Sequence, residues 1–343
     1  MAGIPLEYRT ALITGASSGL GLACARALLE RTNPQWRLII ASRNQAEGER
    51  AAAAMNSKAG RPAVEFMRLD LGSLQSVRDL GAALRARGSR LDALVCNAGL
   101  QFTRERRTSE GFEATFGVNH LGHFALLDEI KGLLAADARI VVVSSGTHDP
   151  RQKAGIPVPR FVDPTLLARP ELDASHQFEQ DDKPHIMMQR RYSTSKLCNL
   201  YFAYELNRRI QDGRFAASKS LTVNGFDPGL MPGSGLARDY PLPLRLIWNQ
   251  ILPRLLPLLR IAISENIHTT DASGRAMADM VDGKDWAGVS GRYAEGRKII
   301  PSSEESYDET KARRLWEVSE ALVGERKTKD EISPPRTDVE PRG

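Results

Sequence analysis

Apolar runs that alternate with helical segments limit what this 343-residue chain can fold into more than any other feature. The runs are rich in β-branched residues and lack a polar face, which is typical of strands buried on both sides of a sheet. Connections between parallel strands are right-handed, so we predict an α/β fold, a doubly wound parallel sheet that binds ligands at the carboxyl ends of its strands. The runs are TALITG (10–15), RLIIAS (37–42), VEFMRLD (64–70), LDALVCNAG (91–99), RIVVVSS (139–145) and LTVNGFDP (221–228).

The pattern is interrupted twice, yet no linker separates a second domain, so we predict a single domain over residues 1–325. Residues 146–189 contain six prolines and few periodic apolar residues, and we expect a long insertion there. Residues 229–263 include the apolar stretch 241–263, in which three arginines and four prolines argue against a membrane-spanning helix. We expect a lid over an apolar pocket, with contact to a membrane surface as the alternative. The polar tail 326–343 is predicted to be disordered.

The composition of the chain indicates which compartment and which classes of partner to expect. Hydrophobic residues make up 41% and charged residues 26% of the chain, which is ordinary for a soluble globular protein. The net charge of +5 is spread without a like-charge run, so we expect no nucleic-acid partner. Three dispersed cysteines (Cys24, Cys96 and Cys198) suit a reducing compartment. No secretory signal is recognised at the N-terminus, so we expect a cytoplasmic protein, with peripheral membrane association as the alternative.

A glycine-rich turn joins the first strand to the first helix. It reads TGASSGLG from Thr14 to Gly21, with the spacing G-x-x-x-G-x-G. Glycine permits a tight turn and close approach of the backbone to a pyrophosphate, and the helix N-terminus supplies free N–H groups and a partial positive charge. A plain turn is the alternative, but the position between strand and helix favours a dinucleotide site. The predicted contacts are Gly15, Ser17, Ser18, Gly19, Leu20 and Gly21.

The end of the second strand bears on the choice of cofactor. A site for NAD usually has an acidic residue here, whereas this chain has Ser42 and Arg43 and no acidic residue before Glu47. Arg43 suits a 2′-phosphate through charge-assisted hydrogen bonds, so we predict NADPH over NADH, with a solvated surface arginine as the alternative. After the third strand, Asp70 and its neighbour Leu71 are predicted cofactor contacts. Asp70 would hydrogen-bond the adenine, with a helix N-cap as the alternative.

Two tyrosine–lysine pairs have the i, i+4 spacing that places both side chains on one helix face: Tyr192 with Lys196, and Tyr307 with Lys311. A phenol has a pKa of about 10 and is a poor proton donor at neutral pH, but a nearby lysine charge can lower that pKa by several units. Only the first pair follows a strand that ends in serines. Acidic residues surround the second pair, which predicts a solvated helix start. Tyr192 and Lys196 are therefore the candidate acid and its partner.

Five motifs follow one another in order: TGASSGLG, NAG (97–99), NHLGHF (119–124), SS (144–145) and the Y-x-x-x-K pair. With them the chain resembles the short-chain dehydrogenase/reductase family over residues 8–325. The resemblance implies a Rossmann-like fold, NADP(H) as cofactor and a small apolar carbonyl or alcohol substrate. A homo-oligomer is expected, with a monomer as the alternative. The resemblance adds cofactor contacts at Asn97, Ala98, Gly99, Tyr192, Lys196, Pro228 and Gly229.

The family resemblance also assigns catalytic roles. Tyr192 would be the general acid/base, and Lys196 would lower its pKa and bind the nicotinamide ribose. Ser145 would hydrogen-bond the substrate oxygen. Asn119 would hold a water-linked proton path from Lys196. Together they imply hydride transfer to a carbonyl carbon, or the reverse oxidation of an alcohol.

Other side chains capable of chemistry are interpreted as structural. His120 and His123 stand three apart on a predicted helix but lack a clear third ligand, so a metal site is the weaker alternative and no metal is expected. Cys198 lies two residues after Lys196 on another helix face, and packing is expected for it rather than redox chemistry.

The finer resemblance is to the light-dependent protochlorophyllide reductases and the retinol-dehydrogenase-like reductases near them. It rests on LDALVCNAG, GVNHLGHF, YSTSKLCN and the closing KARRLWEVSEALVG, and on the long insertion before Tyr192. Two positions depart from the photoenzymes: Leu230 stands where they have a cysteine, and Gly99 where they tend to have a second alanine. We therefore expect a dark NADPH-dependent reductase of an apolar aldehyde or ketone. A protochlorophyllide reductase is the first alternative, and a non-catalytic NADPH-binding sensor or scaffold is the second.

Overall fold

The computed structural model describes residues 8–32, 34–152, 154–174, 183–215, 218–232, 242, 246, 250–255 and 266–332. Its centre is an eight-stranded sheet with the order β3-β2-β1-β4-β5-β6-β7-β8. Neighbouring strands are parallel except β7 and β8, which are antiparallel. The strands are β1 (Tyr8–Thr14), β2 (Gln35–Ser42), β3 (Val64–Arg68), β4 (Leu91–Cys96), β5 (Leu134–Val143), β6 (Thr222–Asp227), β7 (Tyr293–Glu295) and β8 (Lys298–Ile300).

All six predicted strands are present, and the fold is the predicted doubly wound sheet. The short strand expected near 291–295 is β7, whereas β8 was not predicted. Strand β8 has only three residues, two of them exposed, so it shows no buried apolar run.

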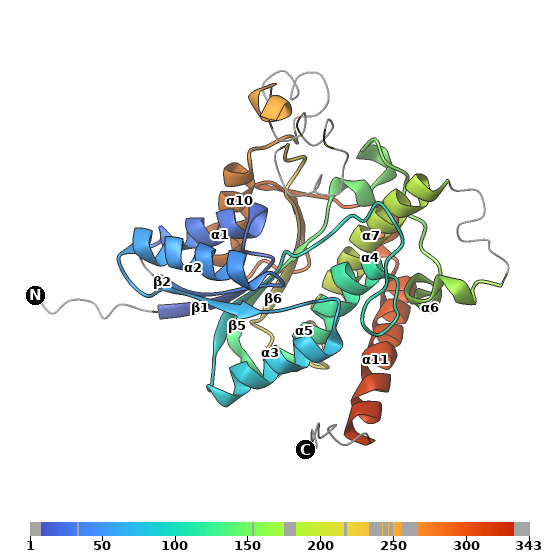
Figure 1. The fold of residues 1–343 in the computed structure, drawn as a ribbon, viewed down its shortest axis with the longest axis horizontal. Coiled ribbons are helices and arrows are strands. Elements are labelled where there is room, and N and C mark those ends of the chain that lie inside the picture. The colour runs from blue at the N-terminus through green and yellow to red at the C-terminus, as the bar shows by residue number, and fades with distance from the viewer. Residues whose placement is uncertain are drawn as a thin grey trace, which may run out of the picture.

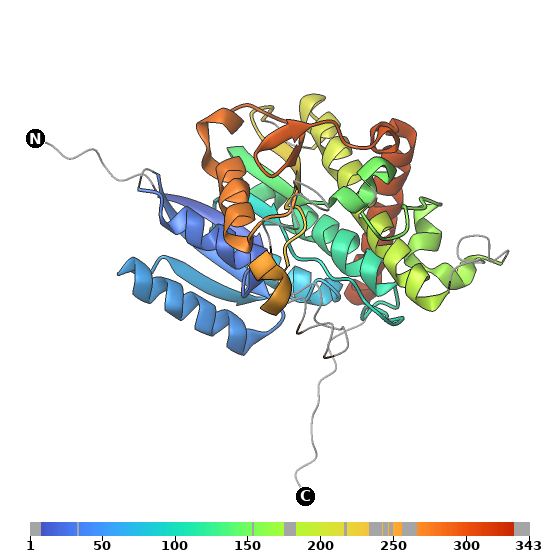
Figure 2. The ribbon, with the colours of Figure 1, turned by 90° about the horizontal axis from the view of Figure 1, so that it is seen from above.

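Helices cover both faces of the sheet (Figures 1 and 2). Helices α1 and α10 pack together on one face, and α7 packs with α11 on the other, where α3 also packs with α5. The helices are α1 (Gly19–Leu29), α2 (Gln45–Ala59), α3 (Leu74–Ala86), α4 (Ala114–Phe116), α5 (Gly122–Ile130), α6 (Pro164–Ala168), α7 (Pro184–Gln211), α10 (Thr270–Asp282) and α11 (Glu309–Ile332).

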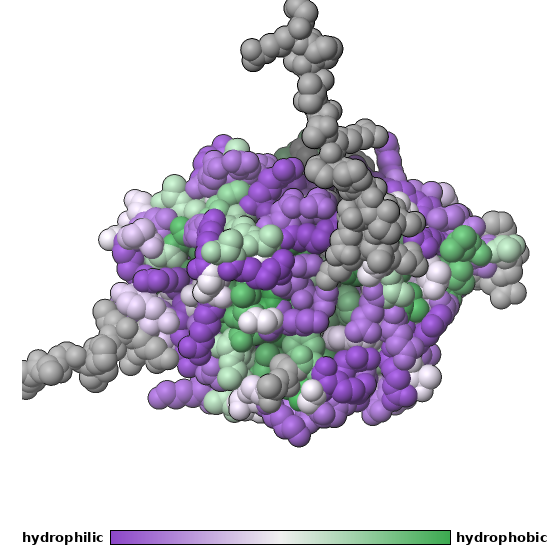
Figure 3. Space-filling model, turned by 90° about the horizontal axis from the view of Figure 1, so that it is seen from below, coloured by the Kyte–Doolittle hydropathy of each residue, from purple (hydrophilic) through white to green (hydrophobic). Residues whose placement is uncertain are grey.

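The sheet separates two apolar cores because successive residues of a strand point to opposite faces. In β1, Leu12 packs with the α3, α5 and α7 side, whereas Ala11 and Ile13 pack with the α1 and α10 side. All three are fully buried. Burial on both faces explains why the central strands appear in the sequence as continuous apolar runs. Outside these cores, hydrophilic residues cover most of the lower face and surround a smaller hydrophobic area (Figure 3).

The helical pattern of apolar residues in the sequence predicts one long helix over 109–134, and this prediction is wrong. The segment forms α4, a π-helical turn over Gly117–Leu121, and α5. Helix α4 starts late because the carboxylate of Glu113 accepts the N–H groups of Thr115 and Phe116, which is an N-cap. The π turn follows directly and places one extra residue in the helix, a feature frequent at functional sites.

Two other helix ends differ from prediction. The sequence pattern predicts a helix from about Ser264, but α10 begins at Thr270, because Thr269 caps it by accepting the N–H of Ala272. Helix α11 continues to Ile332, past residue 325 where the domain was predicted to end. Residues 333–343 lie outside the described part of the chain, so the disorder predicted for them stays a prediction.

The predicted insertion and lid are only partly described. Within 146–189 the structure shows short helices including α6, and α7 already begins at Pro184. Most of 229–263 lies outside the described residues, but Leu242 and Leu246 from it are 64% and 51% exposed. Among the helices that the structure describes, none is long and apolar enough to cross a membrane.

Candidate active site

A cavity of about 1010 Å³ opens at the carboxyl ends of β1, β2, β4, β5 and β6, where the sequence placed the ligand. It brings the glycine-rich turn, the second-strand residues, the NAG motif and the candidate pair Tyr192 and Lys196 into one site. The predicted cofactor contacts that line it are Gly15, Ser17, Ser18, Gly19, Leu20, Ser42, Arg43, Asp70, Leu71, Asn97, Ala98, Gly99, Tyr192, Lys196, Pro228 and Gly229.

The glycines of the turn serve two purposes. Gly15 and Gly19 have φ angles of 66° and 56°, which residues with a side chain rarely adopt. A Cβ at Gly19 would meet nothing within 4 Å, so this part of the turn is open to a ligand. A Cβ at Gly21 would lie 2.6 Å from Asn97 Nδ2 and 2.8 Å from the oxygen of Gly15. Gly21 is therefore needed for packing, and it does not line the cavity.

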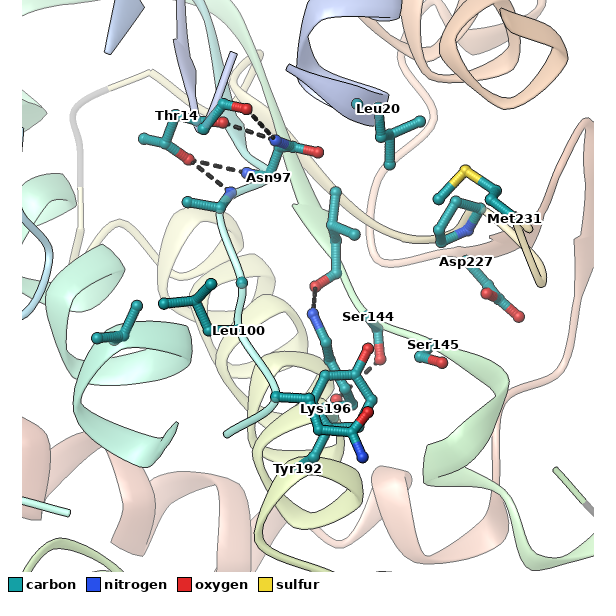
Figure 4. A pocket seen from close by; sticks show the side chains of 18 of the residues that line it. Thr14, Leu20, Asn97, Leu100, Ser144, Ser145, Tyr192, Lys196, Asp227 and Met231 are labelled. Carbon is teal, nitrogen blue, oxygen red and sulfur yellow. Dashed lines mark hydrogen bonds between the residues drawn. The ribbon is translucent and has the colours of Figure 1, made fainter. Parts of the chain in front are cut away.

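Thr14 links the turn to β4, a role that sequence reasoning missed. Its hydroxyl oxygen accepts the main-chain N–H groups of Asn97 and Ala98, both at 3.0 Å. Asn97 Nδ2 returns a hydrogen bond of 2.7 Å to the carbonyl oxygen of Thr14 (Figure 4). These bonds hold two predicted cofactor-binding segments together. They arise because β1 and β4 are neighbours in the sheet, which the chain order alone does not show.

The end of β2 fits a phosphorylated ribose. Ser42 Oγ is buried and has no hydrogen-bond partner among the residues that the structure describes, although Ser42 lines the cavity. A buried hydroxyl without a partner is unfavourable unless a ligand satisfies it. Arg43 is exposed at the rim, where its charge can reach an anion. Glu47 also lines the cavity, one turn into α2.

Asp70 lines the cavity, and the N-cap alternative for it is wrong. Its Oδ1 accepts the N–H of Gly72 at 2.9 Å, which stabilises the turn after β3. Helix α3 is capped instead by Ser73, whose hydroxyl oxygen accepts the N–H of Ser76. The side chain of Asp70 is thus held at the cavity wall beside Leu71.

Helix α7 carries Tyr192 and Lys196 at the cavity, 8% and 3% exposed respectively. Lys196 Nζ lies 5.6 Å from the centroid of the Tyr192 ring and donates to the carbonyl oxygen of Val143 at 3.3 Å. Burial lowers the pKa of Lys196 to about 8, and the carboxylate of Asp227 acts in the opposite direction. The amine therefore remains mainly charged at neutral pH and close to the phenol.

The two serines at the end of β5 have different environments. Ser144 is buried, and its hydroxyl donates to the main-chain oxygen of Lys196 at 2.8 Å. Ser145 is half-buried, and its hydroxyl oxygen accepts the N–H of Thr147 at 3.3 Å. Ser144 thus ties the strand to α7, and Ser145 lines the same cavity as Tyr192 and Lys196 (Figure 4). Its predicted contact with a substrate oxygen stays a prediction.

Asn119 lies in the π turn and is fully buried. Its Nδ2 donates to the oxygen of Leu100 and to Ser195 Oγ, both at 3.0 Å, and its Oδ1 accepts the N–H of Leu100. Asn119 therefore joins the chain after β4 to the catalytic helix. It is not among the residues that line the cavity, and its part in a proton path stays a prediction.

Gly99 and Gly229 bring the backbone close to this centre. A Cβ at Gly99 would lie 3.2 Å from Lys196 Nζ. Gly229 has a φ of 73° and donates its N–H to Asp227 Oδ1 at 2.9 Å. Asp227 is 1% exposed, and its Oδ2 also accepts Asn266 Nδ2 at 3.0 Å. Sequence reasoning missed Asp227, because an aspartate before a Pro-Gly turn gives no signal of a pocket.

Among the side chains interpreted as structural, His120 and His123 make separate buried contacts. His120 Nε2 lies 2.9 Å from Ser319 Oγ, and His123 Nε2 lies 2.9 Å from Thr14 Oγ1. Burial lowers their pKa values to about 3 and about 4. Within the described residues, no group of three or more histidine, cysteine or acidic side chains could hold a metal ion.

The second tyrosine–lysine pair lies outside the cavity. Tyr307 is 49% exposed and stacks on Tyr204, and Lys311 forms an ion pair with Glu305 at 2.8 Å. Cys198 is fully buried in the apolar core, as predicted.

Comparisons with known proteins agree with this geometry. The family model described as short chain dehydrogenase matches residues 9–155. The chain is 34% identical to the chloroplastic protochlorophyllide reductase of Daucus carota, covering 93% of this chain and 79% of that protein. It is also 34% identical to the protochlorophyllide reductase of Avena sativa, covering 91% of this chain and 99% of the relative.

Solved structures share the fold. A putative uncharacterized protein from Mycobacterium paratuberculosis superposes with a TM-score of 0.65 at 27% identity, covering 93% of this chain and 96% of that one. An angucycline C-6 ketoreductase with bound NADP superposes with a TM-score of 0.55 at 22% identity, covering 83% and 92%. At 22% identity, the similarity to the ketoreductase shows only that the two proteins share a fold.

Proposed function

The chain belongs to the short-chain dehydrogenase/reductase family. We propose that it is an NADPH-dependent reductase of an apolar aldehyde or ketone, or that it catalyses the reverse reaction, oxidation of the alcohol by NADP⁺. The observation that carries the proposal is the meeting of Tyr192, Lys196 and Ser145 at one cavity with the glycine-rich turn. A proton donor, its charged partner and an oxygen-binding hydroxyl are the groups that carbonyl reduction needs.

Bound NADPH would supply the hydride to the carbonyl carbon. Ser145 would hold the carbonyl oxygen, and Tyr192 would give its phenolic proton to that oxygen as the negative charge develops. Lys196 would stabilise the phenolate that is left, because its charge lies close to the phenol in a buried site of low effective dielectric. Reprotonation of Tyr192 from solvent completes the proton balance, and we place Asn119 along that path.

The preference for NADPH rests on the end of β2. Ser42 offers a hydroxyl without a partner among the described residues, and Arg43 offers a cation at the cavity rim. The 2′-phosphate of NADPH would accept hydrogen bonds from both. Glu47 lies farther along α2 and would face the same region, so its carboxylate limits the size of the preference.

The substrate class follows from the cavity wall around Ser145. Apolar side chains from the start of the insertion, the chain after β4 and the chain after β6 line it, and the described lining contains no cysteine. Such a wall favours an apolar body with one reactive oxygen. The apolar residues are Leu100, Ile156, Leu230, Met231 and Ile267.

Light-dependent reduction of protochlorophyllide is the second candidate, and the names of the curated relatives favour it. Against it, Leu230 lines the cavity where the photoenzymes have a cysteine. The chain's own cysteines, Cys24, Cys96 and Cys198, are buried, and burial raises their pKa values, so none is placed to deliver a proton to a pigment.

One experiment separates these candidates. Purified protein is mixed with NADPH or NADH and with aliphatic, terpenoid and retinoid aldehydes and ketones in darkness, and with protochlorophyllide in darkness and under light. NADPH oxidation by a carbonyl compound in darkness supports the proposal. Chlorophyllide formed only under light overturns it in favour of the photoenzyme. Tight NADPH binding without turnover of any compound points instead to a sensor or scaffold.

A further inference from the structure

A buried histidine ties the loop after Ser145 to a distant segment of the chain. His148 is 1% exposed and ends the 3-10 turn Gly146–His148. Its Nδ1 lies 2.6 Å from the main-chain oxygen of Ser145, and its Nε2 lies 3.1 Å from the main-chain nitrogen of Ser303. The two ring nitrogens thus bridge residues that are 158 positions apart.

The partners of the ring determine its tautomer. The N–H of Ser303 can only donate, so Nε2 of His148 must accept and carry no proton. The proton of the neutral ring then sits on Nδ1 and is donated to the oxygen of Ser145. Burial lowers the pKa of His148 and so favours this neutral form, although Asp227 and Asp149 act in the opposite direction.

The segment that receives this bridge also anchors the catalytic helix. Arg151 Nη2 donates to the oxygen of Ser302 at 2.9 Å, so the loop is tied to the segment twice. On the other side, the hydroxyl of Tyr204 lies 2.6 Å from Ser302 Oγ. Tyr204 belongs to α7, twelve residues after Tyr192, which is about 18 Å along the helix axis. Residues 302–303 therefore hold both the Ser145 loop and α7.

We propose that His148 is a positioning residue, which fixes the main chain of Ser145 against residues 302–303 and so holds the Ser145 hydroxyl in register with Tyr192. This inference rests on the proposed role of Ser145 at the substrate oxygen. Misplacement of a reacting group by about 1 Å can reduce the rate by about 10²-fold. A neutral imidazole ring suits this role because one nitrogen donates a hydrogen bond and the other accepts one. An amide side chain at position 148 can replace only one of these two contacts.

Two amide substitutions separate the two contacts of the ring. In His148→Asn the amide nitrogen can replace Nδ1 and keep the bond to Ser145, but it cannot reach Ser303. In His148→Gln the longer side chain can reach the N–H of Ser303, but it leaves the oxygen of Ser145 without its donor. Each variant therefore breaks the bridge at one end, and we expect both to lose tenfold or more in kcat with an unchanged dissociation constant for NADPH. A kcat equal to that of the wild type in either variant overturns the proposal.

A double-mutant cycle distinguishes positioning from general stability. If His148 acts through Ser145, then adding His148→Gln to Ser145→Ala should cost no further kcat, whereas a purely structural defect should still lower it. Thermal unfolding of each variant shows how much folded protein each assay contains. If His148→Gln lowers kcat as much in the Ser145→Ala background as in the wild type, the proposal is contradicted.

A spectroscopic measurement tests the tautomer of His148 without a substrate and without an activity assay. Nitrogen-15 NMR of the wild type, labelled at its six histidines, should show the His148 ring as a neutral tautomer protonated at Nδ1. The signal is assigned by its loss in His148→Asn at low temperature. A ring protonated at Nε2 overturns the inference. If the tautomer is correct but no carbonyl compound is reduced, the proposed function fails and the clamp on the Ser145 main chain stands.

Discussion

The cofactor half and the substrate half of the cavity are built differently. On the proposed cofactor side, the turn between β1 and α1 and the ends of β2, β3 and β4 each supply cavity-lining residues from short, local stretches of sequence. On the substrate side, the wall is assembled from distant segments: the loop after Ser145, the chain after β6, and Asn266 and Ile267 before α10. The first half can be recognised from motifs, whereas the second depends on contacts between remote residues.

The largest effect on turnover is expected from a substitution at Tyr192, where the two halves of the cavity meet. Tyr192→Phe removes the proton donor and should lower kcat/KM by about 10²- to 10⁴-fold, because a positioned general acid contributes that much. Tyr201→Phe on the same helix is the matched control. Tyr201 Oη is buried and has no hydrogen-bond partner in the described part of the chain, so its removal should leave turnover near the wild-type value. Steady-state kinetics in darkness measure both, and near-normal turnover by Tyr192→Phe would rule out the mechanism.

The glycine-rich turn should be sensitive to a single methyl group. In Gly21→Ala the new Cβ would lie within 3 Å of Asn97 Nδ2 and of the Gly15 oxygen, so the turn or β4 must shift. Overpacking of about 1–3 kcal/mol corresponds to a rise of roughly 5- to 150-fold in the NADPH dissociation constant, if the whole cost falls on the bound state. Fluorescence titration measures the NADPH dissociation constant. Gly132→Ala is the control, since its Cβ would meet nothing within 4 Å. Equal affinities in both variants would show that the turn does not hold the cofactor.

The choice of cofactor should change with one charge at the rim. Arg43→Ala removes the cation proposed to bind the 2′-phosphate and should lower the preference for NADPH over NADH by about tenfold, as expected for a charge-assisted hydrogen bond of about 1.5 kcal/mol. Arg50→Ala, on an exposed part of α2, serves as the control. The ratio of kcat/KM for the two cofactors is the measurement, and an unchanged ratio would leave Arg43 as a surface residue.

Turnover should depend on pH through Lys196, whose pKa is lowered to about 8 by burial. Below that pH the amine is charged and lowers the pKa of the Tyr192 phenol. As the pH rises through about 8 the charge is lost, so kcat/KM for reduction should fall by severalfold between pH 8 and 9. A profile that stays flat to pH 10 would contradict this role for the Lys196 charge.

The smallest effect is expected at a position where this chain departs from the photoenzymes. The Cβ of Gly99→Ala would approach Lys196 Nζ to 3.2 Å, but the end of a flexible side chain can move by a few tenths of an ångström. We expect kcat/KM to change by no more than about threefold. A large loss would mean that the close approach of Gly99 to Lys196 determines the position of the amine and separates this chain from its relatives.

Most of the cofactor half could be predicted because its signals are local. Continuous apolar runs marked the six central strands, and the sheet placed Ser42, Arg43 and Asp70 at their carboxyl ends as expected. Context also separated the catalytic pair from Tyr307 and Lys311, which the structure places outside the cavity.

The π turn at Asn119 could not be predicted. A helical pattern of apolar residues does not reveal an extra residue in one turn, because the spacing of buried side chains changes by a single position. Thr14, Asp227 and His148 were missed for a related reason. Each is an ordinary polar residue whose role depends on a partner from a neighbouring strand or a distant segment.

The amino-acid sequence by itself determined the class of fold, and it predicted a place for the dinucleotide and a candidate acid with its lysine, because periodicity and short motifs express local physical requirements. Only the tertiary structure decided which distant residues contact the loop after Ser145 and which side chains line the rest of the cavity. Those roles depend on burial and on hydrogen bonds such as that between His148 and Ser303, which join residues far apart in the chain. A buried donor or acceptor needs a partner wherever the fold brings one, and no local pattern records that requirement.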